Sequence, residues 1–144
     1  MRILIKLYRL SKYLNSLGHV RSARLVKRIN LFLTGADIAV DANLGDIVIP
    51  HPVGVVIAGE VIVEDGSRIL TGAVLGSDPG FRTDQAETDH YVTIVRKRTL
   101  IGAGAKVMCG IEIGEYSIVG ANAVVTKNIP PRSIAVGVPA KVIR

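Results

Sequence analysis

General base chemistry is the chemistry for which this 144-residue chain is best equipped, and histidine performs it most often. His51 stands between Pro50 and Pro52, and because both prolines fix φ and lack a backbone N–H, we expect His51 at a defined corner of the backbone. Asp37 lies fourteen residues upstream, close enough in a coiled backbone to stack near His51. A carboxylate on one imidazole nitrogen fixes the tautomer and raises the basicity of the other. The pair therefore predicts a general base for a hydroxyl group.

A metal site is the main alternative for these histidines and carboxylates. His51 and His90 are too far apart for the short His-x-x-His spacing of many metal sites, and His19 lies in a different segment. Cys109, the single cysteine, falls inside an apolar repeat, where we expect a small buried residue. The sequence therefore predicts no metal. One cysteine also forms no internal disulfide, which favours a reducing, cytoplasmic compartment.

A repeat of six residues must position these side chains. The period predicts neither an amphipathic helix nor an ordinary strand, and hexapeptide self-similarity is typical of a β-helix solenoid, in which neighbouring coils bury one another's apolar residues. An all-β sandwich fits less well, because its strands alternate polar and apolar residues with irregular turn spacing. The repeated positions are Ile38, Leu44, Ile57, Val63, Ile69, Leu75, Val95, Ile101, Val107, Ile113, Val119 and Val125.

The expected solenoid covers residues 36–129 and is interrupted by a loop at residues 76–94. This loop is polar and without periodicity, and a loop of that length inside a compact repeat is usually functional. Pro130 and Pro131 are expected to end the solenoid, which leaves residues 130–144 as a C-terminal tail.

Residues 1–35 have a different pattern, typical of two short helices. Apolar residues recur at helical spacing up to Gly18, which is expected to stop the first helix, and a second helix is expected from Val20 to Leu33, ending at Gly35. Residues 1–33 contain eight lysines and arginines, and no acidic residue occurs before Asp37.

Two roles are compatible with this basic helical segment. We favour a cap over the open end of the solenoid, which such a stack requires. A basic amphipathic helix can also lie on an anionic membrane, here the inner face of the cell membrane. The net charge of +6 agrees with an anionic ligand or surface. Nucleic acid is not expected, because the segment has no aromatic stacking platform and no recognition motif. The sequence predicts neither a transmembrane helix nor a signal peptide.

Several stretches resemble the serine O-acetyltransferase branch of the hexapeptide-repeat acyltransferases. They are ADI at 36–38, HPVGVVIAGEVIVEDGSRIL at 51–70, LGS at 75–77, IGAGAK at 101–106 and PPRSIAVGVPAKVI at 130–143. The resemblance implies a left-handed parallel β-helix, a homotrimer, and active sites in the clefts between subunits. The left-handed sense comes from the resemblance alone, because ordinary parallel crossovers are right-handed.

The resemblance also implies acetyl-CoA as the acyl donor and assigns roles to individual residues. The family's catalytic pair falls on Asp37 and His51, and its second active-site histidine on His90. Lys127 and Lys141 are expected to bind the CoA phosphates. The family's pantetheine contacts fall near three small residues, each of which can equally be a turn residue: Ser77, Ala103 and Ala121. For the two alanines, the sequence alone favours the turn.

Two departures from the family pattern bear on the acceptor. Pro50 stands where the family has an aspartate that binds the amine of serine, and Asp89 stands where it has an arginine that pairs with the carboxylate. An aspartate facing a carboxylate repels it. These changes favour a sugar hydroxyl in surface polysaccharide biosynthesis, on a sugar or a lipid-linked saccharide. The alternatives are a serine O-acetyltransferase of cysteine biosynthesis and a non-catalytic hexapeptide scaffold protein.

Overall fold

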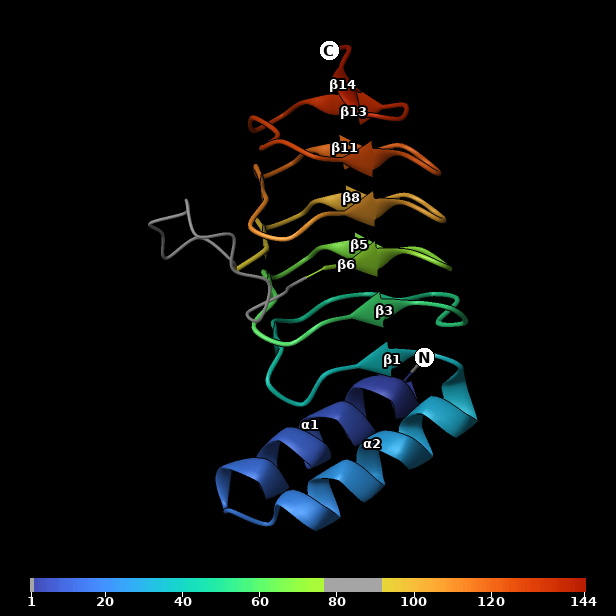
Figure 1. Cartoon of the computed structure of the whole chain (residues 1–144), viewed down its shortest axis with the longest axis vertical. Helices are drawn as coiled ribbons and strands as arrows, with labels where there is room; N and C mark the ends of the chain where they lie inside the picture. Colours follow the sequence, from blue (N-terminus) through green and yellow to red (C-terminus); the bar gives the residue numbers. More distant parts are fainter. Residues whose placement is uncertain (1, 77–91) are drawn as a thin grey trace, which may run out of the picture.

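The computed structural model describes residues 2–76 and 92–144, and these form a stack of flat coils with two helices at one end (Figure 1). The chain climbs from the helices to the C-terminus at the opposite end of the stack. Most of the predicted loop at 76–94 lies outside the described residues, and with it Ser77, Asp89 and His90.

Three sheets form the faces of the stack, and all their strand pairs are parallel except that of the last two strands along the chain. Successive strands of one coil belong to different sheets. The first face contains β1 (Asp37–Ile38), β3 (Val56–Ile57), β6 (Val74–Leu75), β9 (Lys106–Val107) and β12 (Val124–Val125). The second contains β2 (Asn43–Leu44), β4 (Ile62–Val63), β7 (Ile94–Val95) and β10 (Glu112–Ile113). The third contains β5 (Arg68–Ile69), β8 (Leu100–Ile101), β11 (Ile118–Val119), β13 (Ile134–Val136) and β14 (Lys141–Val142).

A regular coil takes eighteen residues, as shown by the pairing of Val56 with Val74 and of Lys106 with Val124. Three faces in eighteen residues give six residues to each face, which confirms the hexapeptide prediction. Val74 pairs with Lys106 across the break, so the stack resumes in register after the segment 77–91.

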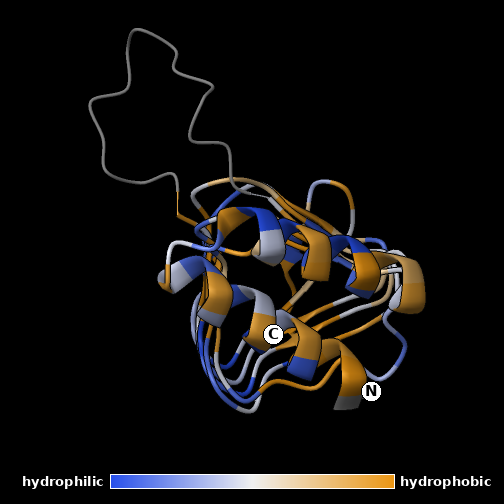
Figure 2. Cartoon of the chain, turned by 90° about the horizontal axis from the view of Figure 1, so that it is seen from below, coloured by the Kyte–Doolittle hydropathy of each residue, from blue (hydrophilic) through white to orange (hydrophobic). Residues whose placement is uncertain are grey.

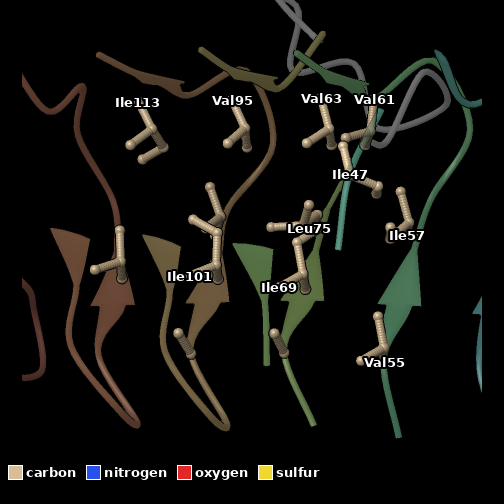
Figure 3. Packing of buried hydrophobic residues seen from close by; sticks show 14 of the residues in the cluster. Ile47, Val55, Ile57, Val61, Val63, Ile69, Leu75, Val95, Ile101 and Ile113 are labelled. Atoms are coloured by element: carbon tan, nitrogen blue, oxygen red, sulfur yellow. The ribbon is translucent and has the colours of Figure 1, made fainter. Parts of the chain in front are cut away.

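The branched aliphatic residue of each repeat points into the stack. Figure 3 shows Val63, Val95 and Ile113 in one row and Ile69 and Ile101 in another, and all five are at most 1% exposed. Each such side chain contributes about 1.5–3 kcal/mol when it is fully buried, so these rows are the main source of stability. One predicted core position, Leu44, is half-buried rather than buried. Cys109 is also half-buried rather than buried, because it lies in a corner turn.

Hydroxyl side chains occupy one buried corner of the stack. Ser67 donates to the carbonyl of Arg96 at 3.0 Å, Thr99 to that of Gly114 at 3.1 Å, and Ser117 to that of Pro130 at 2.8 Å. Each hydroxyl therefore satisfies a carbonyl group of the next coil, which is why small polar residues are tolerated in this part of the core.

The N-terminal segment forms α1 (Arg2–Ser16) and α2 (Val20–Thr34), as the sequence predicts. Gly18 and Gly35 take left-handed φ angles of +79° and +70°, which favour glycine and end the two helices. Leu4 and Tyr8 of α1 join the core of the solenoid, so the helices cover its end. Burial raises the pKa of Tyr8, whose hydroxyl donates to the carbonyl of Ala42. Neither helix is long and apolar enough to cross a membrane, in the part of the chain that the structure describes.

The stack continues beyond the predicted boundary at residue 129. Strand β13 pairs in parallel with β11, and only then does β14 fold back antiparallel to β13. Pro130 and Pro131 lie in the corner between Ile129 and β13, where no ladder hydrogen bond is required. The prolines therefore mark a corner of the last coil rather than its end.

Candidate active site

His51 lies in a two-residue insertion at the corner between the third and first faces. Before this corner, Ile69 donates to the carbonyl of Val48 in the coil below, and after it Gly72 donates to the carbonyl of Val53. Val48 is therefore matched with Arg68, and Val53 with Thr71. The lower coil advances five residues between these two points, from Val48 to Val53, whereas the next coil advances only three, from Arg68 to Thr71. The extra residues fall in Pro50-His51-Pro52, and His51 is exposed. The insertion thus presents the imidazole outside the regular stack.

Asp37 occupies the outward position of β1, beside Val56 of the next coil. The Lys27 ammonium lies 2.8 Å from Asp37 Oδ1, and the Asp37 side chain is 43% exposed. This contact is close enough for an ion pair but lacks the angles of a hydrogen bond, so the covered Oδ1 has no hydrogen-bond donor among the described residues. Within residues 2–76 and 92–144, no hydrogen bond or ion pair joins Asp37 and His51. Their pairing stays a prediction.

Ala103 and Ala121 lie on the same edge of the solenoid as the corner of His51. Thr71 donates its hydroxyl to the carbonyl of Val53 at 2.8 Å, Gly104 donates to that of Thr71 at 2.9 Å, and Asn122 donates to that of Ala103 at 2.8 Å. Val53, Thr71, Ala103 and Ala121 therefore form one column of turn residues. Ala121 is exposed and Ala103 half-buried, so the column leaves room for a ligand to approach the backbone.

Lys127 and Lys141 are both exposed but lie in different parts of the stack. Lys127 follows β12 at the corner between the first and second faces. Lys141 belongs to β14 at the edge of the third face, where it pairs with Val136. Their proposed contacts with CoA phosphates stay a prediction.

The two ends of the segment 77–91 meet at one corner of the stack. Thr93 donates its hydroxyl to the carbonyl of Gly76 at 2.6 Å, and Gly76 donates its N–H to Val107 at 2.9 Å. Ser77 and His90 belong to the segment between these anchors and lie outside the described residues.

Sequence reasoning missed a ladder of charges on the second face. Arg96 donates from Nε to Glu112 Oε1 at 2.7 Å and from Nη1 to Glu64 Oε1 at 2.8 Å, which joins three successive coils. The hydrogen bond from Arg96 lowers the pKa of Glu64, and Glu112 followed by Glu64 raises the pKa of Arg96. Lys97 pairs with Glu115 at 3.1 Å.

Metal ligands do not gather in the described part of the chain. No group of three or more His, Cys, Asp or Glu side chains in residues 2–76 and 92–144 could hold a metal ion.

Comparison with known proteins identifies a consistent set of relatives. Residues 92–127 match the bacterial transferase hexapeptide (six repeats) family. A serine acetyltransferase of Buchnera aphidicola is 40% identical over 142 residues, which are 97% of this chain and 52% of the relative. A serine acetyltransferase of Helicobacter pylori is 35% identical over 137 residues, which are 94% of this chain and 77% of the relative. This chain spans about half the length of the Buchnera protein.

The structural comparison agrees with the sequence comparison. A serine acetyltransferase of Brucella abortus in complex with coenzyme A superposes with a TM-score of 0.86 at 31% identity, over 96% of this chain and 54% of that protein. This match confirms the predicted left-handed parallel β-helix with a helical N-terminal segment.

Proposed function

Because this chain belongs to the hexapeptide-repeat transferase family and its homologues are serine acetyltransferases, we propose that it is an acetyl-CoA-dependent O-acetyltransferase. The observation that carries the proposal is the structural match to a serine acetyltransferase bound to coenzyme A, which extends over nearly the whole chain. The exposed imidazole of His51, on the same edge as Ala103 and Ala121, supports it.

The proposed reaction is a direct acyl transfer. His51 accepts the proton of the acceptor hydroxyl, and the hydroxyl oxygen attacks the thioester carbonyl of acetyl-CoA. The tetrahedral intermediate then collapses, its C–S bond breaks, and the departing thiolate of CoA takes up the proton from His51. The products are an O-acetyl ester and CoA. Asp37 would orient the imidazole, and His90 would assist by stabilising the oxyanion or by binding the acceptor.

We propose L-serine as the acceptor, because the homologues are serine acetyltransferases. This corrects the expectation of a polysaccharide sugar, which none of the relatives described above supports. A sugar hydroxyl stays the second candidate because of the two departures in the sequence: Pro50 offers no carboxylate to an amino group, and Asp89 stands where the family has an arginine.

The decisive experiment measures release of the CoA thiol from acetyl-CoA with L-serine, and in parallel with a panel of sugars. We expect release with serine, and His51→Ala should lower kcat by about 100-fold or more, the usual contribution of a general base. His19→Ala is the matched control, because His19 is also exposed but lies between the two helices. An unchanged rate in His51→Ala would refute the mechanism. Thiol release with sugars but not with serine would show that the acceptor is a sugar. Failure to bind CoA would favour the non-catalytic scaffold protein.

We also propose a homotrimer, because hexapeptide-repeat acetyltransferases generally assemble in this way. Outward-facing apolar side chains on the coils, such as Val53 at 67% exposure, agree with burial against another subunit. Light scattering coupled to size-exclusion chromatography should give three times the mass of one chain, and a monomeric mass would contradict this.

A further inference from the structure

The outer face of the helical cap exposes large apolar side chains next to basic ones. On the opposite side, Leu4, Tyr8 and Ala23 are buried against the stack or the neighbouring helix, so the cap already has its packed side. Phe32 is nevertheless 88% exposed. Figure 2 shows both helices side by side across this end of the molecule, with hydrophobic and hydrophilic segments alternating along each.

Each helix carries an apolar row and a basic row at helical spacing. On α2, Leu25, Ile29 and Phe32 form an exposed apolar row, and an exposed basic row runs beside it. On α1 and just beyond its end, Leu10, Tyr13 and Leu17 form the matching apolar row. The basic residues are Arg21, Arg24 and Arg28 on α2 and Lys6 and Arg9 on α1, all exposed.

No acidic residue lies within residues 1–36 to neutralise these charges. Lys27 is paired with Asp37, but Arg21, Arg24 and Arg28 form no ion pair with any residue that the structure describes. A second copy of this chain is a poor occupant for the face, because a symmetric contact would bring like charges together. An anionic lipid surface accepts both rows, since the apolar side chains enter the acyl boundary and the arginines meet the headgroup phosphates.

We propose that this outer face, formed by α1 and α2, docks the protein on an anionic lipid bilayer as a peripheral, salt-sensitive contact. The inference does not depend on the proposed acetyl transfer, because it uses none of the residues of the candidate active site. The docked stack would stand on the membrane through its N-terminal end, with the last coil farthest from the lipid (Figure 1).

The test is co-sedimentation of the full chain with vesicles of phosphatidylcholine alone, or of phosphatidylcholine with one quarter phosphatidylglycerol, at low and high salt. We expect binding to the anionic vesicles that weakens as salt rises. The triple variant Arg21→Ser, Arg24→Ser, Arg28→Ser should bind about 100-fold more weakly. Phe32→Ser should weaken binding about tenfold, because it removes a large apolar side chain from the interface.

Matched variants on the coils control for charge and hydrophobicity. Arg68, Lys127 and Arg144 are exposed on the solenoid, so replacing all three with serine removes the same charge from a different surface. Val138→Ser removes an apolar side chain that is 72% exposed. Both controls should bind vesicles like the unchanged chain.

Equal binding to neutral and anionic vesicles would overturn the proposal, as would equal weakening by the solenoid controls. Absence of vesicle binding, together with an oligomeric mass that falls in Phe32→Ser, would also overturn it, because the face would then contact a second copy. Circular dichroism should be unchanged in every variant, since all the substituted side chains are exposed.

Discussion

Replacing Arg96 with methionine removes the guanidinium that joins three coils of the solenoid while keeping an unbranched side-chain stem. Arg96 lies 2.8 Å from Glu64 in the preceding coil, before the segment 77–91, and 2.7 Å from Glu112 in the following coil. Without it, these two carboxylates remain on the same face without their cation. The variant therefore tests how far this ladder holds the stack together across the break in the repeat.

The solvent exposure of Arg96, Glu64 and Glu112 limits how much stability the two ion pairs contribute. The three side chains are 34–46% exposed, so solvent screens both ion pairs, and each contributes no more than about 1 kcal/mol. Loss of both should lower the free energy of unfolding by about 1–2 kcal/mol. For a chain of this size, that lowers the melting temperature by roughly 3–6 °C at pH 7.

The pH dependence gives this prediction its sharpest test. Arg96 holds the pKa of Glu64 below its ordinary value of 4.5, the value expected in the unfolded chain. A depressed pKa stabilises the fold above the unfolded value, and that contribution is lost as the pH falls through the folded value. The difference in melting temperature between the unchanged chain and Arg96→Met should therefore be constant from pH 8 to about pH 5.5 and shrink below about pH 4.

Thermal melts followed by circular dichroism across this pH range provide the measurement. Lys97→Met is the matched control, because it removes the same charge but only one ion pair, with Glu115, and Lys97 is more exposed than Arg96; it should have a smaller effect. A melting difference at pH 3.5 as large as that at pH 7 would show that packing, and not charge, causes the effect. No decrease at pH 7 would refute a stabilising role for the ladder.

Three further substitutions test the fold. Gly102→Ala should cost about 1–3 kcal/mol or more, because its Cβ would lie 2.6 Å from the next coil's backbone, whereas at Gly59, whose φ is also not positive, the nearest atom is a carboxylate oxygen of the exposed Asp41 side chain, which can move; equal urea midpoints for the two alanine variants would contradict this. Ile101→Ala should lower the free energy of unfolding by about 2–5 kcal/mol, since Ile101 is fully buried, and a urea-midpoint loss equivalent to under 1 kcal/mol would count against the inward rows. Tyr8→Phe should lower the free energy of unfolding by about 0.5–1 kcal/mol in the same urea experiment, because the carbonyl of Ala42 still accepts a hydrogen bond from the Lys12 ammonium at 2.7 Å. A larger loss of stability would mean that Lys12 does not compensate for the missing tyrosine hydroxyl.

The six-residue spacing is enough to predict the solenoid, because one side chain per face must enter a narrow core. Ile57, Leu75 and Val107 were therefore assignable to the interior from the sequence alone, and they are buried. The end of the stack was not assignable in this way. Pro130 and Pro131 interrupt the pattern, and a sequence does not distinguish a corner from a terminus when the next inward residue is as small as Ala135.

The candidate site is less accessible to sequence reasoning than the fold. The prolines around His51 indicated a corner, and the register places that corner outside the regular coil. The ion pair between Lys27 and Asp37 depends on how α2 is rotated against β1, which residue spacing does not determine. The ladder at Arg96 depends on the register across the break, which the aperiodic sequence between Leu75 and Val95 does not determine.

The hydrogen bond between Thr93 and Gly76 holds together the two points at which the chain leaves the stack and returns to it. Closing a longer excursion between fixed ends costs only about 0.6 kcal/mol for each doubling of its length. The coils on either side of this excursion pair in register, as the match of Val63 with Val95 shows. This corner is therefore a natural position for evolutionary exchange, where one lineage can replace a whole peptide segment while inheriting the rest of the scaffold unchanged.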